Sequence, residues 1–402
     1  MRSICVLLLA ALAAMAPSAS AQEPATRAEA LAAEREAKAQ QLEPYRPGGL
    51  EQGLLRLENG RFLERILNPP VGLYPKLGSI TPGSGFSMGP GYRKPGLFGG
   101  HADFNTFAAI SFTKYWMIDA RLLMPRLANE TLFFDVHAQR YDFPSEVFFG
   151  IGPESSREND VGYGLRSSAF GTGGGVRAAP WLTFSGGVDY LTPAISRPED
   201  ETFIADRFDA IEVPGLLRQP DFVRYQAIAD LNYRAPRGNP RRGGRYLLTY
   251  QHYDERDLQR YSFDRVEVDL QQYIPLLKDR RVLALRSFVS MSDGEEIPFY
   301  YLRTLGGPDD LRGFTRYRFR DRNLLLLQAE YRWEIFTAMD GAIFYDAGKV
   351  APRREDLNFD DLESDYGIGF RFGTINGVFL RIEGAFGSSG GKHFIFRYGH
   401  IF

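Results

Sequence analysis

Arg312 stands in the stretch of this 402-residue chain that is best suited to specific ion pairing. It lies between Leu311 and Gly313 in LGGPDDLRGFTRYRF, residues 305–319, a glycine-rich, charged and aromatic run too polar for a strand. Residues 344–348, FYDAG, form a second small motif. By themselves, these patterns are typical of a solvated loop arginine near unrelated carboxylates. We interpret the loop and the motif as one site inside a membrane barrel, which the rest of the chain has to support.

No other group of residues indicates chemistry. The five histidines are scattered without metal-ligand spacing, and no Ser-His-Asp order or carboxylate pair stands out. The glycine-rich stretches 83–91 and 171–175 lack the strand-turn-helix context of a phosphate-binding loop. We therefore expect no catalytic residues, no cofactor and no metal. The 48 basic and 50 acidic residues nearly balance, so no nucleic-acid partner is expected.

The N-terminus has the pattern of a secretory signal peptide. Arg2 precedes an apolar run that ends in small residues at Ala21, which predicts a signal peptide at 1–21 and export of the chain. Cys5 is the only cysteine, so the mature chain has no thiol. Residues 22–72 predict a short helical periplasmic or plug segment, which the barrel of residues 73–402 follows.

Alternating polar and apolar residues dominate from about residue 79 onward. Clear examples are Arg265–Tyr273, Leu324–Trp333 and Val378–Phe386. Half-buried strands of a soluble β-sandwich alternate in the same way. The membrane is favoured because the runs have the roughly ten-residue length of a tilted spanning strand, with aromatic residues near their ends. Charges of both signs on the polar faces suit a wet lumen. We expect an all-β fold, a transmembrane antiparallel β-barrel.

About sixteen such runs can be counted, from 79–92, through 297–304 as the eleventh, to 393–402. An even number is typical of a bacterial barrel formed by one chain. The long connection 191–221 then falls among the short turns. Either it is an elaborated turn, or a strand near 144–160 is missed or invented.

The last strand, HFIFRYGHIF, ends the chain with alternating aromatic residues. An aromatic terminal strand ending in Phe is the signal that outer-membrane assembly machinery recognises. The alternative is a coincidental aromatic tail. The side chains expected to form the signal are Phe394, Phe396, Tyr398 and Phe402.

The chain resembles the BamA/TamA family of outer-membrane barrels, also called bacterial surface antigens, over about residues 73–402. The resemblance is densest between Ile297 and Gly348, in IPFYYLRTLGG, LRGF, YRFRDRN, AEYRW and FYDAG. It implies sixteen strands and a sixth extracellular loop that folds back into the lumen. It also implies that the arginine at the loop tip meets acidic residues on the two following strands.

Carried over, the resemblance implies that Arg312 meets Glu330 and Asp346, with Phe344 on the same face as Asp346. Strand alternation agrees, since it puts both carboxylates on polar faces. Each charge-assisted bond is worth roughly 1.5–3 kcal/mol. Gly313 is expected to permit a tight turn. We call the predicted set the loop-to-lumen brace; its residues are Arg312, Gly313, Phe314, Glu330, Phe344 and Asp346.

Two functions remain open. Family members that insert barrels or export proteins carry periplasmic POTRA domains, whereas about 50 residues precede this barrel after the predicted cleavage. We expect either assembly or translocation of proteins or lipids with a separate periplasmic partner, or a structural or pore-type barrel. Both place the chain in the bacterial outer membrane, in contact with its lipid. The resemblance also implies a seam between the first and last strands, which Pro82 and Pro90 would weaken.

Overall fold

The computed structural model describes residues 71–199, 201–277, 279–336, 338–374, 377–388 and 391–397, together with Arg35, Glu36, Lys38, Gly49 and Gln52. The predicted signal peptide, nearly all of the predicted segment 22–72, and the side chains of Tyr398 and Phe402 lie outside the described residues. Within the described part, no helix is long and apolar enough to cross a membrane.

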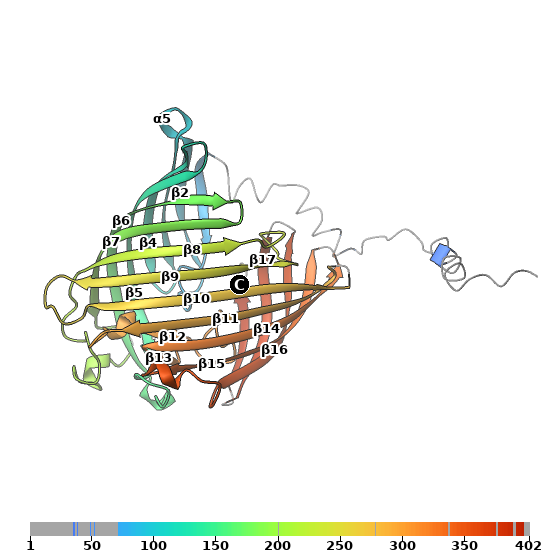
Figure 1. The fold of residues 1–402 in the computed structure, drawn as a ribbon. Helices are drawn as coiled ribbons and strands as arrows, with labels where there is room; N and C mark the ends of the chain where they lie inside the picture. Colours follow the sequence, from blue (N-terminus) through green and yellow to red (C-terminus); the bar gives the residue numbers. More distant parts are fainter. Residues whose placement is uncertain are drawn as a thin grey trace, which may run out of the picture. The chain divides into compact units, whose positions relative to one another are not determined.

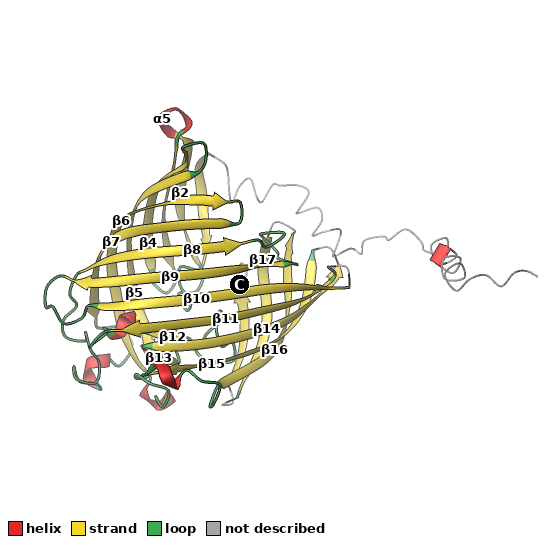
Figure 2. Ribbon diagram, viewed as in Figure 1, coloured by secondary structure: helices red, strands yellow, loops and turns green. Residues whose placement is uncertain are grey.

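Sixteen strands of the described chain form one antiparallel sheet in which neighbours in the sheet follow chain order (Figures 1 and 2). They are β1 (Gly72–Gly78), β2 (Ser87–Gly96), β3 (Ala102–Ser111), β4 (Trp116–Leu127), β5 (Leu132–Phe148), β6 (Val161–Ala179), β7 (Leu182–Ser196), β8 (Phe222–Asn232), β9 (Gly243–Glu255), β10 (Phe263–Leu276), β11 (Arg281–Asp293), β14 (Asn323–Phe336), β15 (Met339–Ala351), β16 (Glu363–Thr374), β17 (Gly377–Gly387) and β18 (Lys392–Arg397). The sheet curves into a barrel wall (Figure 2). The predicted fold class and strand number are confirmed.

The remaining elements are short. β12 (Arg303–Leu305) and β13 (Phe319–Asp321) pair in a separate two-stranded sheet. α5 (Leu97–Gly100) joins β2 to β3. The described chain also contains short 3₁₀ helices, namely η2 (Arg157–Asn159), η3 (Ile204–Asp206), η4 (Phe299–Tyr301) and η5 (Arg354–Asp356).

Two strand assignments made from the sequence are wrong, and their errors cancel in the count. The predicted first strand, 79–92, is a turn followed by part of β2, and the true first strand is β1. The predicted eleventh strand, 297–304, contains η4 and only the start of β12. Its apolar aromatic residues pack inside the barrel instead of forming wall. Pro82 therefore lies in a turn, and Pro90 lies in β2 opposite Pro75 of β1, so neither belongs to a terminal strand as the sequence had suggested.

The extra strand at the start explains why the long connection 191–221 seemed to fall among the short turns. Adding β1 moves the β7–β8 loop, 197–221, to the barrel end that carries the long β11–β14 loop, 294–322. The opposite end has short turns, such as 180–181 between β6 and β7. Near 144–160, the structure simply extends β5 to Phe148 and begins β6 at Val161, so a strand was neither missed nor invented there.

The two faces of the wall differ as the alternation predicts. In β14, Gln328, Glu330 and Arg332 are buried on the inner face. Their partners across the ladder in β15 include Asp346 and Phe344, which are buried as well. The outer face carries exposed apolar and aromatic side chains, as expected for a surface in contact with lipid.

A cluster of buried apolar side chains, here called the lumen cluster, fills the barrel at its long-loop end. The strands contribute their residues nearest the long loops, and loops 197–221, 256–262 and 294–322 contribute the rest. The cluster comprises Phe148, Val161, Tyr163, Leu191, Ile204, Val213, Leu216, Phe222, Tyr253, Tyr261, Phe263, Ile297, Phe299 and Leu302. Phe299 lies edge-on to Phe148 and Tyr163, with ring centroids 5.5 and 4.9 Å away. The long loops thus share one apolar core with the wall.

The pairing of β1 depends on a close contact that can be tested. The Tyr74 hydroxyl donates a 2.8 Å hydrogen bond to Asn105, and a Cβ atom at Gly91 would lie 2.2 Å from the Tyr74 ring. Gly91→Ala should therefore displace Tyr74 and lower the free energy of unfolding by about 1–3 kcal/mol. The loss of heat-modifiable gel mobility with temperature measures this. Gly384→Ala is the control because nothing lies within 4 Å of its added Cβ. Equal stability of the two variants would contradict the contact.

Candidate functional site

The long β11–β14 loop turns back along the inner wall of the barrel. The β12–β13 ladder pairs Leu305 with Phe319, so that residues 306–318 form the loop tip. Gly306 and Gly307 have φ angles of 113° and 118°, which favour glycine, and a Cβ atom at Gly306 would lie 2.5 Å from the Thr315 carbonyl oxygen. The paired glycines therefore set the path of the tip.

Apolar side chains press the tip against the wall. Leu311 is fully buried and Phe314 nearly so. Both pack in one cluster that the ladder and the inner faces of β14 and β15 complete with Leu305, Phe319, Leu324, Leu326 and Val350. Because these anchors flank Arg312, they hold its side chain against the strands that carry the acidic groups.

Arg312 contacts three carboxylates at once. Its Nε and Nη2 donate to the two carboxylate oxygens of Asp346 at 2.6 and 2.8 Å, a bidentate pair. Its Nη1 donates to Glu330 at 3.1 Å and to Glu383 at 3.2 Å. The guanidinium carbon lies 3.3 Å from the centroid of the Phe344 ring. The structure thus brings the predicted arginine, both predicted carboxylates and the predicted aromatic ring together.

Glu383 is a partner of Arg312 that the sequence analysis did not predict. Alternation places Glu383 with Arg381 on the polar face of its strand, which is the only signal for it. Glu383 is 1% exposed, and its second oxygen accepts a 3.2 Å hydrogen bond from Arg381 Nη1. The site therefore includes β17 as well as β14 and β15.

Further ion pairs extend the network to two more strands. Arg332 Nε donates to Glu330 at 2.6 Å, and Arg371 of β16 also donates to Glu330. In the loop, Asp309 lies 3.1 Å from Arg381 and 3.1 Å from Arg397 of β18. The loop tip is consequently bonded to the wall from β14 to β18.

The charges of the site are buried and stabilise one another. Burial by itself would lower the pKa of Arg312, but the carboxylates of Asp346, Glu383 and Glu330 raise that pKa above its ordinary value. The guanidinium thus stays charged at all physiological pH values. Buried ions of this kind are tolerated only when their partners are complete.

Gly313 serves a close approach instead of the expected tight turn. It is absent from the glycines with positive φ. A Cβ atom at Gly313 would lie 2.5 Å from the Gly387 nitrogen and 2.6 Å from the Asp365 Cβ. Glycine is needed here because the loop backbone touches β16 and β17 directly.

The predicted C-terminal signal is described in part. Phe394 and Phe396 are 77% and 55% exposed, and both point outward from β18, since their neighbour Ile395 is buried against the inner-face residues Phe344 and Ala385. Recognition by assembly machinery stays a prediction.

Removing the central charge tests the site. Arg312→Ala leaves three buried carboxylates without their shared partner, so we expect a loss of about 3–5 kcal/mol in unfolding free energy. Arg312→Lys keeps the charge but loses the bidentate geometry, and should fall between that variant and the wild type. Urea unfolding of the refolded protein in detergent micelles measures both.

Arg353→Ala is the control, because Arg353 makes an exposed loop ion pair with Asp356 and should change stability little. The interpretation fails if Arg312→Ala unfolds at the same urea concentration as Arg353→Ala.

Comparisons with known proteins agree with this geometry. A family model, the Omp85 superfamily domain, matches residues 231–389, and no curated protein matches the chain. BamA from Haemophilus ducreyi lacking POTRA domains 1-3 is similar in structure, with a TM-score of 0.61, 13% identity, and coverage of 91% of this chain and 81% of that chain. CdiB from Escherichia coli has a TM-score of 0.56 and 10% identity, with coverage of 82% and 62%. Residues 231–389 therefore match an Omp85 superfamily domain within a barrel that has the fold of BamA, in agreement with the family resemblance seen in the sequence.

Proposed function

We propose that this barrel assembles or translocates proteins or lipids in the outer membrane, after export by the signal peptide at 1–21 and together with a separate periplasmic partner. The observation that carries the proposal is the connection of the loop tip to the last strand. Asp309 bonds Arg397 of β18, and a Cβ atom at Gly391, just before β18, would lie 2.2 Å from the Gly313 carbonyl oxygen. A movement of the loop would therefore disturb the strand at the barrel's edge.

The edge itself supports the proposal. Among the described residues, β1 pairs with β2 and β18 with β17, and no ladder joins β1 to β18. Unpaired strand edges present backbone N–H and C=O groups to which another strand can add. A barrel that receives a client segment needs such an edge.

The interior favours this function over an open pore. The lumen cluster occupies the long-loop end, and Arg320 ties the loop into it by donating hydrogen bonds to the Phe299 carbonyl at 3.0 Å and to the Tyr163 hydroxyl at 3.1 Å. A pore that is always open would need a polar, water-filled passage at this level. Passage through the barrel would instead require the loop or the edge to move.

Locking the edge tests the proposal. A disulfide between a cysteine in β1 and one in β18 should abolish complementation of a deletion strain, measured as recovery of other barrels in its outer-membrane proteome, while heat-modifiable mobility persists. Leu77→Cys with Met88→Cys is the control, since these residues already face each other across β1 and β2. Full complementation by the locked β1–β18 protein would exclude a moving edge.

Conductance measurements distinguish the proposed function from the alternative, a pore-type barrel. The wild type should conduct little in planar bilayers, whereas replacing loop residues 306–318 by a short Gly-Ser linker should raise conductance severalfold, provided that heat-modifiable mobility shows a folded barrel. Steady wild-type conductance, together with a normal outer-membrane proteome in the deletion strain, would favour the pore-type protein instead.

A further inference from the structure

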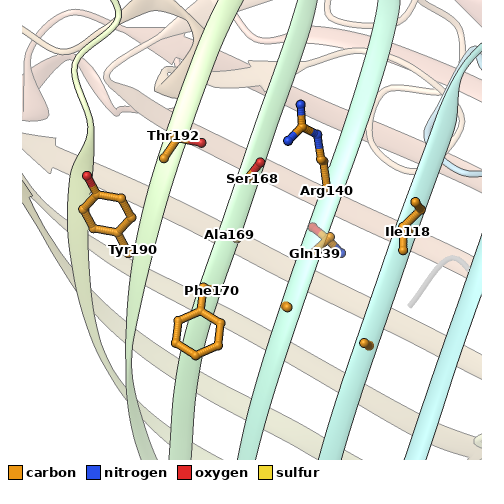
Figure 3. A pocket seen from close by; sticks show the side chains of 10 residues that line it. Ile118, Gln139, Arg140, Ser168, Ala169, Phe170, Tyr190 and Thr192 are labelled. Carbon is orange, nitrogen blue, oxygen red and sulfur yellow. The ribbon is translucent and has the colours of Figure 1, made fainter.

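The outer wall carries a hollow across β4, β5, β6 and β7, here called the wall groove (Figure 3). Its volume is about 320 Å³, and the side chains along it include Ile118, Ala120, Ala138 and Phe170. They belong to the outer face because Asp135, three residues before Ala138 in β5, and Asp189, opposite Gly171 next to Phe170, are buried on the inner face. Small alanines in place of bulky side chains produce the hollow. The groove is independent of the lumen network.

One end of the groove is polar. Arg140, Ser168 and Thr192 face one another across three strands, in one row of the sheet (Figure 3). The adjacent row, farther from the long loops, contains Phe170 and Ala138 and is apolar. The groove therefore crosses from a polar to an apolar zone, as the lipid-facing wall does where headgroups meet acyl chains.

Arg140 has no partner in the described part of the chain. Of the charged residues on the outer face of β5, β6 and β7, Asp142 and Arg166 pair with each other, with Nη2 2.8 Å from Oδ2. Arg140 is exposed, and it makes neither an ion pair nor a hydrogen bond with any described residue. Its positive charge at a lipid-facing wall is uncompensated, and a guanidinium is suited to bind a phosphate.

The apolar wall is held in a fixed shape. Tyr190 lies next to Phe170 across the β6–β7 ladder, and its hydroxyl donates a 2.6 Å hydrogen bond to Asp221. That bond fixes the ring at the side of the groove. Ile118 of β4 lines the other side of the groove, next to Arg140 across the β4–β5 ladder. An extended hydrocarbon chain fits between such walls over the alanines.

We infer that the wall groove binds a membrane lipid with a phosphate headgroup, whose phosphate contacts Arg140 and whose acyl chain lies over Ala138 and Ala120. The position of Arg140 toward the long-loop end assigns this lipid to the leaflet on that side. Serine and threonine hydroxyls of the same row are available to donate to further phosphate oxygens.

Native mass spectrometry of the full chain released from detergent micelles tests the inference. The probes are phosphatidic acid and a diacylglycerol with the same acyl chains, which differ only in the phosphate. The wild type should retain phosphatidic acid and release diacylglycerol. Arg140→Gln should weaken phosphatidic acid binding about tenfold, because a charge-assisted hydrogen bond is lost. Ala138→Leu should weaken it by filling the floor of the groove.

Matched controls use the same wall. Lys94→Gln removes a positive charge from the outer face of β2, and Ala227→Leu enlarges an outward alanine of β8; both should bind phosphatidic acid like the wild type. Heat-modifiable mobility confirms that each variant is folded. Equal retention of phosphatidic acid by Arg140→Gln, or equal retention of diacylglycerol by the wild type, would overturn the inference. Displacement of the lipid by glycerol phosphate would show that the site binds a phosphate group without acyl chains. This result would also overturn the inference.

Discussion

The burial of one positive charge organises the lumen. The Arg312 side chain has no exposed surface, and neither do those of Glu330, Asp346 and Glu383 around it. Removing four ions from water is unfavourable unless their geometry is complete, so the loop and three strands must reach their places together. The paired glycines, the apolar anchors and the close approach of Gly313 all serve this requirement. The loop path and the wall therefore depend on each other.

The same coupling connects the interior with the edge of the sheet. Carboxylates and guanidinium groups alternate along one series of ion pairs, so each ion holds its neighbours in position. The series runs through Glu330, Arg371, Glu383, Arg381, Asp309 and Arg397. Such networks rigidify a structure when satisfied and become unstable when a member is withdrawn. Withdrawal of the loop tip would therefore remove an ion pair from the edge strand β18, which is the link that the proposed function uses.

The sequence predicted what depends on short-range pattern and missed what depends on register. Period-two alternation identified most wall strands, because each shows one polar and one apolar face. β1 (GLYPKLG) is short and interrupted by proline, so alternation did not identify it, while the aromatic run at 297–304 resembled a wall strand although it packs inside. Arg312, Glu330 and Asp346 followed from the family resemblance. Glu383 and Arg371 could not, because only the register that places Gly369 opposite Glu383 brings these groups to one site.

On both faces of the wall, charged side chains lie next to groups of opposite charge. Inside, the charges that touch Arg312 are balanced by groups from other strands, and outside, Asp142 balances Arg166. Arg140 departs from this rule, since the described chain offers it no anion. Lipid contact makes an unbalanced arginine costly unless it lies near the headgroups, where an anion from outside the chain is available. The polar row of Ser168 and Thr192 places Arg140 at that level. The missing partner is then supplied by the membrane.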